Sequence, residues 1–128
     1  MNIRLILQTA SICIFTIISC VYPLQSMGYE LTDLGTLDGT FSTGEDINAN
    51  GHVTGTSDIA NGETRAFLYM GTSMQDLGKL DVTHTGSNAN GINDRDHVTG
   101  TSSLTPAYSP VYRAFLYSNG VMQDLGIT

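Results

Sequence analysis

A pair of short apolar segments occurs twice in this chain, and this motif constrains the fold more than any other feature. The first copy joins residues 65–69 (Arg-Ala-Phe-Leu-Tyr) to residues 74–78 (Met-Gln-Asp-Leu-Gly). The same two segments return at residues 113–117 and 122–126. A further Asp-Leu-Gly, at residues 33–35, has no Arg-Ala-Phe-Leu-Tyr segment before it. Short aromatic and β-branched runs separated by Gly-containing turns are typical of antiparallel strands.

Two more segments of β character precede each copy of the motif. Residues 42–48 lead through Asn50-Gly51 into residues 52–57, and residues 87–93 and 97–102 stand in the same order before the second copy. Asn-Gly between such runs is a hairpin signal.

The sequence therefore predicts an all-β domain over residues 29–128. We expect two four-stranded antiparallel sheets, over residues 42–80 and 87–127, and one extra N-terminal strand over residues 29–37. A four-strand unit of about 45 residues is the period of a β-propeller blade. Ala66 and Leu68 alternate with Phe67 and Tyr69, so both faces of that strand are apolar and both need cover. We expect propeller-like blades packed face to face.

The order of these motifs resembles the HAF-type extracellular repeat family of bacteria. The resemblance lies in Asp-Leu-Gly-Thr-Leu, then Ile-Asn-x-x-Gly-x-Val-x-Gly, then Ala-Phe-Leu-Tyr, and it covers residues 29–128. It implies an exported, propeller-like repeat protein and no known reaction. The chain departs from the family pattern at Tyr69 and Tyr117, where Trp is usual, and at Asp96, where Gly is expected. Asp tolerates the left-handed conformation that Gly51 would adopt at the same place.

Residues 1–28 have the composition of a secretory signal peptide. A positive charge at Arg4 precedes a mostly apolar stretch, and small residues precede a cleavage point after Gly28. A second processing route is open, because the residues before Cys20 look like a bacterial lipobox and would make that Cys the lipidated first residue. We expect a secreted, periplasmic or cell-surface protein of a bacterium without membrane insertion after cleavage, with an outer-membrane lipoprotein as the alternative.

Charge and cysteine content limit the partners and the covalent cross-links. Cys13 and Cys20 both lie in the predicted export segment, so residues 29–128 hold no disulfide of their own. Those residues carry four basic and twelve acidic side chains, which gives a net charge of −8. An acidic chain of this kind argues against nucleic acid and anionic membrane as partners.

One segment has the composition of a calcium-binding loop. Asp46, Asn48 and Asn50 place oxygen-bearing side chains at alternate positions, and Gly51 follows them. A calcium loop needs such oxygens and a Gly that permits the bend. The alternative is that Asn50-Gly51 is a hairpin turn. The second unit has Gly91 in place of Asp46, and no other cofactor is expected.

Other polar residues recur with the repeat, which favours structural roles. His52 and His97 occupy equivalent places beside the turns. Asp33, Asp76 and Asp124 each precede Leu-Gly, so we expect them to bond backbone groups where the strand ends.

The sequence contains no set of residues that defines a reaction. No Ser lies in a Gly-x-Ser-x-Gly elbow, and Glu45 and Asp46 are neighbours on one strand that point to opposite faces. We therefore expect no enzyme but an exported non-enzymatic β-repeat module that acts through surface or protein contacts, by self-association or with a protein or glycan partner. Two alternatives stay open. The chain is a truncated fragment of a longer extracellular propeller, because two blades cannot close a ring, or it is a hydrolase or lyase formed only on assembly.

Overall fold

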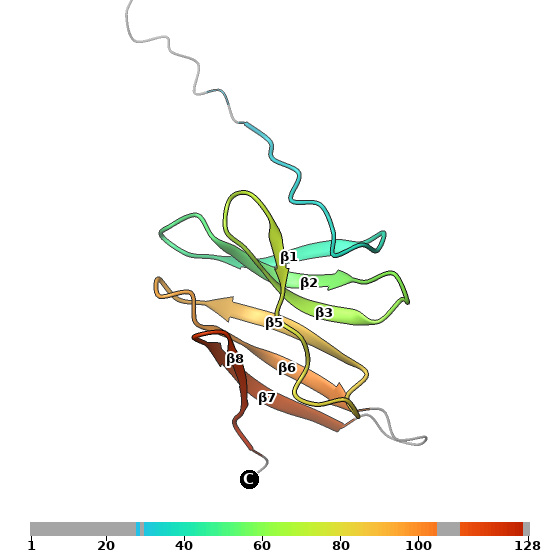
Figure 1. Cartoon of the computed structure of the whole chain (residues 1–128). Helices are drawn as coiled ribbons and strands as arrows, with labels where there is room; N and C mark the ends of the chain where they lie inside the picture. The colour runs from blue at the N-terminus through green and yellow to red at the C-terminus, as the bar shows by residue number, and fades with distance from the viewer. Residues whose placement is uncertain (1–27, 29, 105–110, 127–128) are drawn as a thin grey trace, which may run out of the picture. The chain divides into compact units, whose positions relative to one another are not determined.

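The computed structural model describes residue 28, residues 30–104 and residues 111–126 (Figure 1). Their contacts divide the chain into Met1–Thr32 and Asp33–Thr128, and both sheets belong to the second unit. The described residues contain no helix, so none that is long and apolar enough to cross a membrane is found among them. Most of the predicted export segment, including Cys20, lies outside the described residues.

The described residues form two four-stranded antiparallel sheets, as the sequence predicts. The first sheet contains β1 (Ser42–Ile47), β2 (Val53–Asp58), β3 (Thr64–Tyr69) and β4 (Met74–Asp76). The second sheet contains β5 (Gly86–Ile92), β6 (Val98–Leu104), β7 (Val111–Ser118) and β8 (Val121–Asp124). Each sheet is a meander in which consecutive strands are neighbours.

The two sheets pair equivalent residues in the same register. Gly55 lies opposite Phe67 in the first sheet, and Gly100 lies opposite Phe115 in the second. The first strand of each sheet has one irregularity at the same place, between Gly44 and Asp46 in β1 and between Ala89 and Gly91 in β5. The sequence match therefore extends to backbone pairing, and positions in the two sheets can be compared one by one.

The turns follow from residues that accept a positive φ. Gly51 has φ 78° in the β1–β2 turn, and Asp96 has φ 60° at the equivalent place in the β5–β6 turn. The predicted left-handed conformation of Asp96 is confirmed. Asn119 and Gly120, with φ 52° and 80°, form the two-residue loop between β7 and β8, and positive φ at both positions is the requirement of a type I′ hairpin turn.

The expected N-terminal strand over residues 29–37 is wrong for its described part, because residues 30–37 form no strand. The corresponding residue of the next motif, Leu77, donates its N–H to Ala66 O of β3. No strand is described before residues 30–37, and a strand without a partner leaves its backbone groups unpaired. Leu37 N bonds the Ser57 hydroxyl instead, at 3.0 Å.

Serine hydroxyls attach the Asp-Leu-Gly connectors to the sheets. Ser87 Oγ accepts from Ala66 N at 2.9 Å and donates to Gly78 O. Ser102 Oγ accepts from Leu80 N at 3.2 Å. The first sheet repeats part of this arrangement, since Ser42 Oγ donates to Gly35 O at 2.7 Å. These bonds satisfy backbone groups that the strand ladders leave open.

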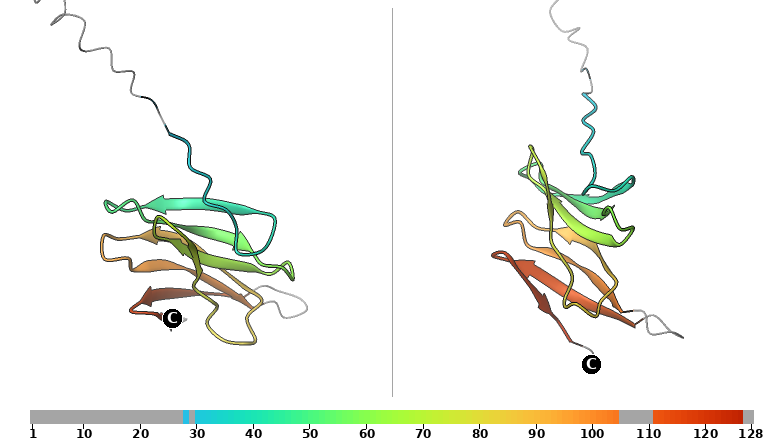
Figure 2. Two further views of the ribbon diagram at one scale, coloured as in Figure 1. Left: turned by 45° about the horizontal axis from the view of Figure 1, so that its top comes forward. Right: turned by 45° about the vertical axis from the view of Figure 1, so that its right-hand side comes forward.

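The main hydrophobic core lies between the two sheets. In β3 and in β7, Ala and Leu point to one face of the sheet, which we call the Ala-Leu face, and Phe and Tyr point to the other, the Phe-Tyr face. The Ala-Leu face of the first sheet packs on the Phe-Tyr face of the second, and β5 lies against β1, β2 and β3 (Figures 1 and 2). The core residues are Ala66, Leu68, Leu77, Ala89, Val98, Phe115 and Tyr117.

Both faces of β3 are covered, as the alternation of its apolar residues predicts. Ala66 and Phe67 point to opposite faces and both are fully buried. Phe67 lies opposite Gly55, where a larger residue would meet backbone atoms of β1. Small residues on β1 and β2 thus make room for the packed aromatic ring.

Candidate functional site

The β1–β2 turn lies against the β5–β6 turn, and side chains of the first turn bind groups of the second. Asn48 Nδ2 donates to Asn93 O at 3.1 Å and to Asp96 Oδ1 at 2.7 Å. His52 Nδ1 lies 2.7 Å from the same Asp96 oxygen. Asp96 therefore holds together two side chains of the preceding turn.

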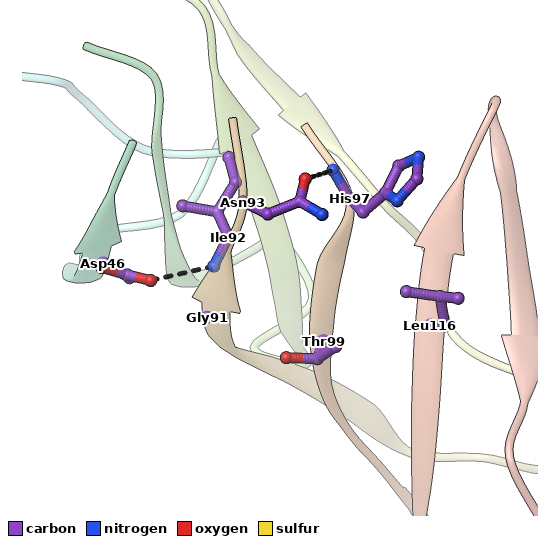
Figure 3. Close-up of a pocket in the computed structure, with 7 residues that line it drawn as sticks. All are labelled: Asp46, Gly91, Ile92, Asn93, His97, Thr99 and Leu116. Carbon is purple, nitrogen blue, oxygen red and sulfur yellow. Dashed lines mark hydrogen bonds between the residues drawn. The ribbon is translucent and has the colours of Figure 1, made fainter. Parts of the chain in front are cut away.

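Further bonds extend this contact along both turns. Ala49 N donates to Asp94 Oδ1 at 2.9 Å, and Asn50 Nδ2 donates to Asp94 O at 3.1 Å. Asp46 Oδ2 accepts from Ile92 N at 2.9 Å (Figure 3). The carboxylates at positions 46, 94 and 96 thus bind groups from the opposite sheet.

The electrostatics of the contact are set by Asp96. The hydrogen bond from His52 is the largest cause that holds the pKa of the Asp96 carboxyl below its ordinary value of 3.8, and the bond from Asn48 acts in the same direction. Both bonds favour the charged carboxylate. Asp96 is therefore ionised at neutral pH and stabilises the loop contact in that form.

Two of the three residues of the predicted calcium loop, Asp46 and Asn48, use their side-chain oxygens inside the protein. Asp46 Oδ1 accepts from Ile47 N, and its other oxygen accepts from Ile92 N. Asn48 Oδ1 accepts from Asn50 N and His52 N. Within the described part of the chain, no three His, Cys, Asp or Glu side chains lie close enough to hold a metal ion. These bonds favour the hairpin reading, and calcium binding stays a prediction.

The predicted backbone bonds of the recurring Asp residues are confirmed, and Asp76 and Asp124, unlike Asp33, stand at a strand end. Asp33, Asp76 and Asp124 each accept the backbone N–H of the Gly two positions later, at 2.9, 2.7 and 2.8 Å. Such Asx turns end the strand, since they replace ladder bonds with a local one. For this reason β4 ends at Asp76 and is shorter than the predicted segment that continues to residue 80.

The two equivalent histidines have different surroundings. His52 lies in the contact between the turns, whereas His97 lines a depression of roughly 320 Å³ (Figure 3). The lining residues are Asp46, Gly91, Ile92, Asn93, His97, Thr99 and Leu116. In Figure 3 the Asp46 carboxylate and the His97 ring lie at opposite ends of the depression, so they do not form an acid–base pair in this arrangement.

One histidine that the sequence left without a role is buried. His84 is 4 % exposed, and its Nε2 lies 4.0 Å from Asp81 Oδ2. Its Nδ1 has no hydrogen-bond partner among the described residues. No neighbouring motif in the sequence signals this burial.

Two surfaces without an assigned role lie on the outer sheet faces. On the Ala-Leu face of the second sheet, Ala114 and Thr99 are exposed and Leu116 is half-buried. Leu125 beside them is 54 % exposed, whereas its counterpart Leu77 is 6 % exposed. The motif that is buried in the first sheet is thus uncovered in the second.

The Phe-Tyr face of the first sheet is open over β1 and β2. A hollow of roughly 330 Å³ there is lined by Gly44, Glu45, Asp46, Ile47 and Val53. Ile47 is 63 % exposed. The equivalent positions of the second sheet, Ala89, Ile92 and Val98, belong to or pack against the core between the sheets.

The fold and these surfaces define an all-β protein of two four-stranded antiparallel sheets with matching register, an open hollow over β1 and β2 and an exposed Ala-Leu face on the second sheet. Comparison of the chain with protein-family models, with curated proteins and with solved structures found no match.

Proposed function

We propose that this chain is an exported, non-enzymatic β-repeat module that works through protein contacts. The observation that carries the proposal is the exposure of the Ala-Leu face of the second sheet, at Ala114 and Leu125. The same residue types, Ala66 and Leu77, form a packed contact in the first sheet. An apolar surface with the composition of an established contact is typical of an interaction site.

The finer architecture belongs to the same proposal. Each sheet is a propeller-like blade, and the resemblance to HAF-type repeats supports this assignment, since that family is exported and has no known reaction. The signal peptide of residues 1–28 directs the chain out of the cytoplasm. The net charge of −7 at pH 7 disfavours nucleic acid as the partner.

A hydrolase or lyase completed on assembly is the second candidate, because of the depression around His97. Leu116 lines this depression and also belongs to the uncovered Ala-Leu face. A partner on that face would therefore supply another wall, and His97 would be the one imidazole already present in the lining.

Turnover assays separate these two functions. The purified chain is assayed on glycan, peptide and ester substrates, alongside His97→Gln and the control Val82→Asp, whose side chain is 91 % exposed. We expect no turnover from any of the three proteins. Turnover that His97→Gln abolishes and Val82→Asp retains would establish the enzyme instead.

Export is tested by the intact mass of the protein recovered outside the cytoplasm. Signal cleavage after Gly28 gives a chain that starts at Tyr29, whereas the lipobox route gives a lipid adduct on Cys20. In the first case Cys20→Ser leaves the mass of the recovered protein unchanged. In the second case the same substitution removes the adduct.

A further inference from the structure

The contact between the two sheets is made from two unlike surfaces. The first sheet contributes its Ala-Leu face, with Ala66, Leu68 and Leu77, and the second contributes its Phe-Tyr face, with Ala89 and Val98. These residues are all buried. The contact is therefore heterologous, since the two sheets contribute different faces to it.

Each sheet surface that takes no part in this contact carries the same residue types as a surface that does. The second sheet carries Ala114, Leu116 and Leu125 uncovered where the first sheet buries its Ala-Leu residues. The first sheet carries Ile47 and Val53 around an open hollow where the second sheet packs Ile92 and Val98. The two free surfaces thus match, in residue type, parts of the two halves of the contact already present inside the chain, although Phe67 of the first sheet is itself buried.

Polar groups of the internal contact also have counterparts on the free faces. Gln75 Nε2 of the first sheet donates to Tyr117 OH of the second at 3.0 Å. Gln123 occupies the position of Gln75 in β8, and Tyr69 occupies the position of Tyr117 in β3. The Tyr69 hydroxyl, which donates to Gly71 O, keeps its acceptor capacity for such a bond.

We propose that a second copy of this chain docks head to tail on the first. The Ala-Leu face of the second sheet of one copy covers the hollow around Ile47 and Val53 of the other, in the way that the two sheets meet at their turns within one chain. At the other end of that face Ser42 and Ser57 already bind Gly35 O and Leu37 N. This inference rests on the proposed function, because it names the partner of the interaction module. A heterologous contact of this kind closes into a ring or continues as a filament.

The contact between copies is weaker than the contact inside the chain. The internal contact depends on carboxylates at Asp46, Asp94 and Asp96. Between copies, Gly91 would stand in the place of Asp46, Ala49 in that of Asp94 and Gly51 in that of Asp96. None of these three residues has a carboxylate. Two copies of net charge −7 also repel each other, and salt screens that repulsion. Association therefore increases with protein concentration and with ionic strength.

The test uses one blocking substitution on each surface. Ala114→Glu puts a charge on the exposed Ala-Leu face, and Ile47→Asp puts a charge at the rim of the hollow; both positions are exposed, so both variants keep the fold. Masses are measured by light scattering coupled to size exclusion, over a concentration series of the purified full chain. Circular dichroism on the same samples checks the fold, and Leu125→Asp replaces Ala114→Glu should that variant be unfolded.

We expect the unmodified chain to form larger species as its concentration rises, and each variant to stay monomeric. An equimolar mixture of the two variants should form a dimer and nothing larger, because the mixture contains one pair of unblocked surfaces. Val82→Asp, the matched control on an exposed loop, should associate like the unmodified chain.

The proposal is overturned if the unmodified chain is monomeric throughout, if the mixture does not form the dimer, or if both variants associate as the unmodified chain does. Failure here leaves the proposed function standing, since a different protein can be the partner. Detection of turnover that depends on His97 would reject the proposed function whatever the oligomeric state.

Discussion

His52 Nδ1 lies 2.7 Å from Asp96 Oδ1, and this pair connects the first sheet to the second. Asp96 occupies the place that Gly51 takes in the first unit, so the contact depends on a residue that breaks the match between the two units. The same carboxylate accepts from Asn48. Because only the second unit has Asp at this position, the second sheet can accept these bonds from the first, whereas the first sheet has Gly51 there and cannot accept them from the second. The order of the two sheets in the contact is therefore fixed by this one difference between the units.

Replacing Asp96 by Gly should destabilise the protein by about 1 kcal/mol. The substitution removes the acceptor of the His52 and Asn48 bonds, which costs roughly 1–2 kcal/mol net, while relief of the positive φ recovers part of that. Asp38→Gly is the matched control, because Asp38 is exposed and has φ 76° away from the turn contact. Urea unfolding should show the control as stable as the unmodified chain or slightly more stable, and a variant at Asp96 of equal stability would contradict the assigned role.

The Asp96 contact should weaken in acid. Since the folded-state pKa of Asp96 is below the ordinary value of 3.8, its contribution to the free energy of unfolding is fully present above that value and is lost as the pH falls through the folded-state pKa. The difference in unfolding free energy between the unmodified chain and Asp96→Gly should shrink as the pH falls below about 4. A difference that grew in this range would have the wrong sign.

Replacing Gly51 by Asp should strengthen association between copies. The new carboxylate would occupy the place of Asp96 and face His97 of the docked copy, as Asp96 faces His52 within the chain. Charge-assisted bonds of this kind contribute about 1 kcal/mol, or several-fold in affinity, after the strain of φ 78° is subtracted. Gly62→Asp adds the same charge at φ 82° in an exposed turn and should not strengthen association. Equal behaviour of the two variants in light scattering would contradict the docking geometry.

Two glycines of the strands should differ in their tolerance of Ala. A Cβ at Gly100 would clash with Asn88 O and lie 2.8 Å from Phe115 Cζ, so Gly100→Ala should cost about 2 kcal/mol or more. A Cβ at Gly44 would lie 3.3 Å from Val53 Cγ1, and the equivalent residue of the second sheet is Ala89. Thermal unfolding should therefore show Gly44→Ala within about 0.5 kcal/mol of the unmodified chain. The prediction fails if the two substitutions have the same effect.

Ser87→Ala should destabilise the protein more than Ser42→Ala. Ser87 is fully buried, and its loss leaves Ala66 N and Gly78 O without their partner, at a cost of about 1–3 kcal/mol. Ser42 makes one exposed bond to Gly35 O, so its loss should cost less than about 1 kcal/mol. Paired urea titrations measure the two values, and the reverse order would show that Ser87 does not support the contact between the sheets.

The sequence by itself determined the features that depend on neighbouring residues. The alternation of Ala66, Phe67 and Leu68 predicted a strand covered on both faces, and the structure buries all three. The place of Asp96 in a turn predicted its positive φ, and the recurring Asp-Leu-Gly predicted a backbone bond at the strand end. Such features follow from steric and hydrogen-bonding preferences over a few residues.

Only the tertiary structure decided what lies across each face. Ala66 and Ala114 occupy the same position of the same five-residue motif, yet Ala66 is fully buried and Ala114 is exposed. Residues 33–35 carry the same Asp-Leu-Gly as residues 76–78, yet residues 30–37 form no strand. Burial and strand pairing depend on a neighbour that is distant in the chain, and identical local sequence therefore takes on different roles where that neighbour differs.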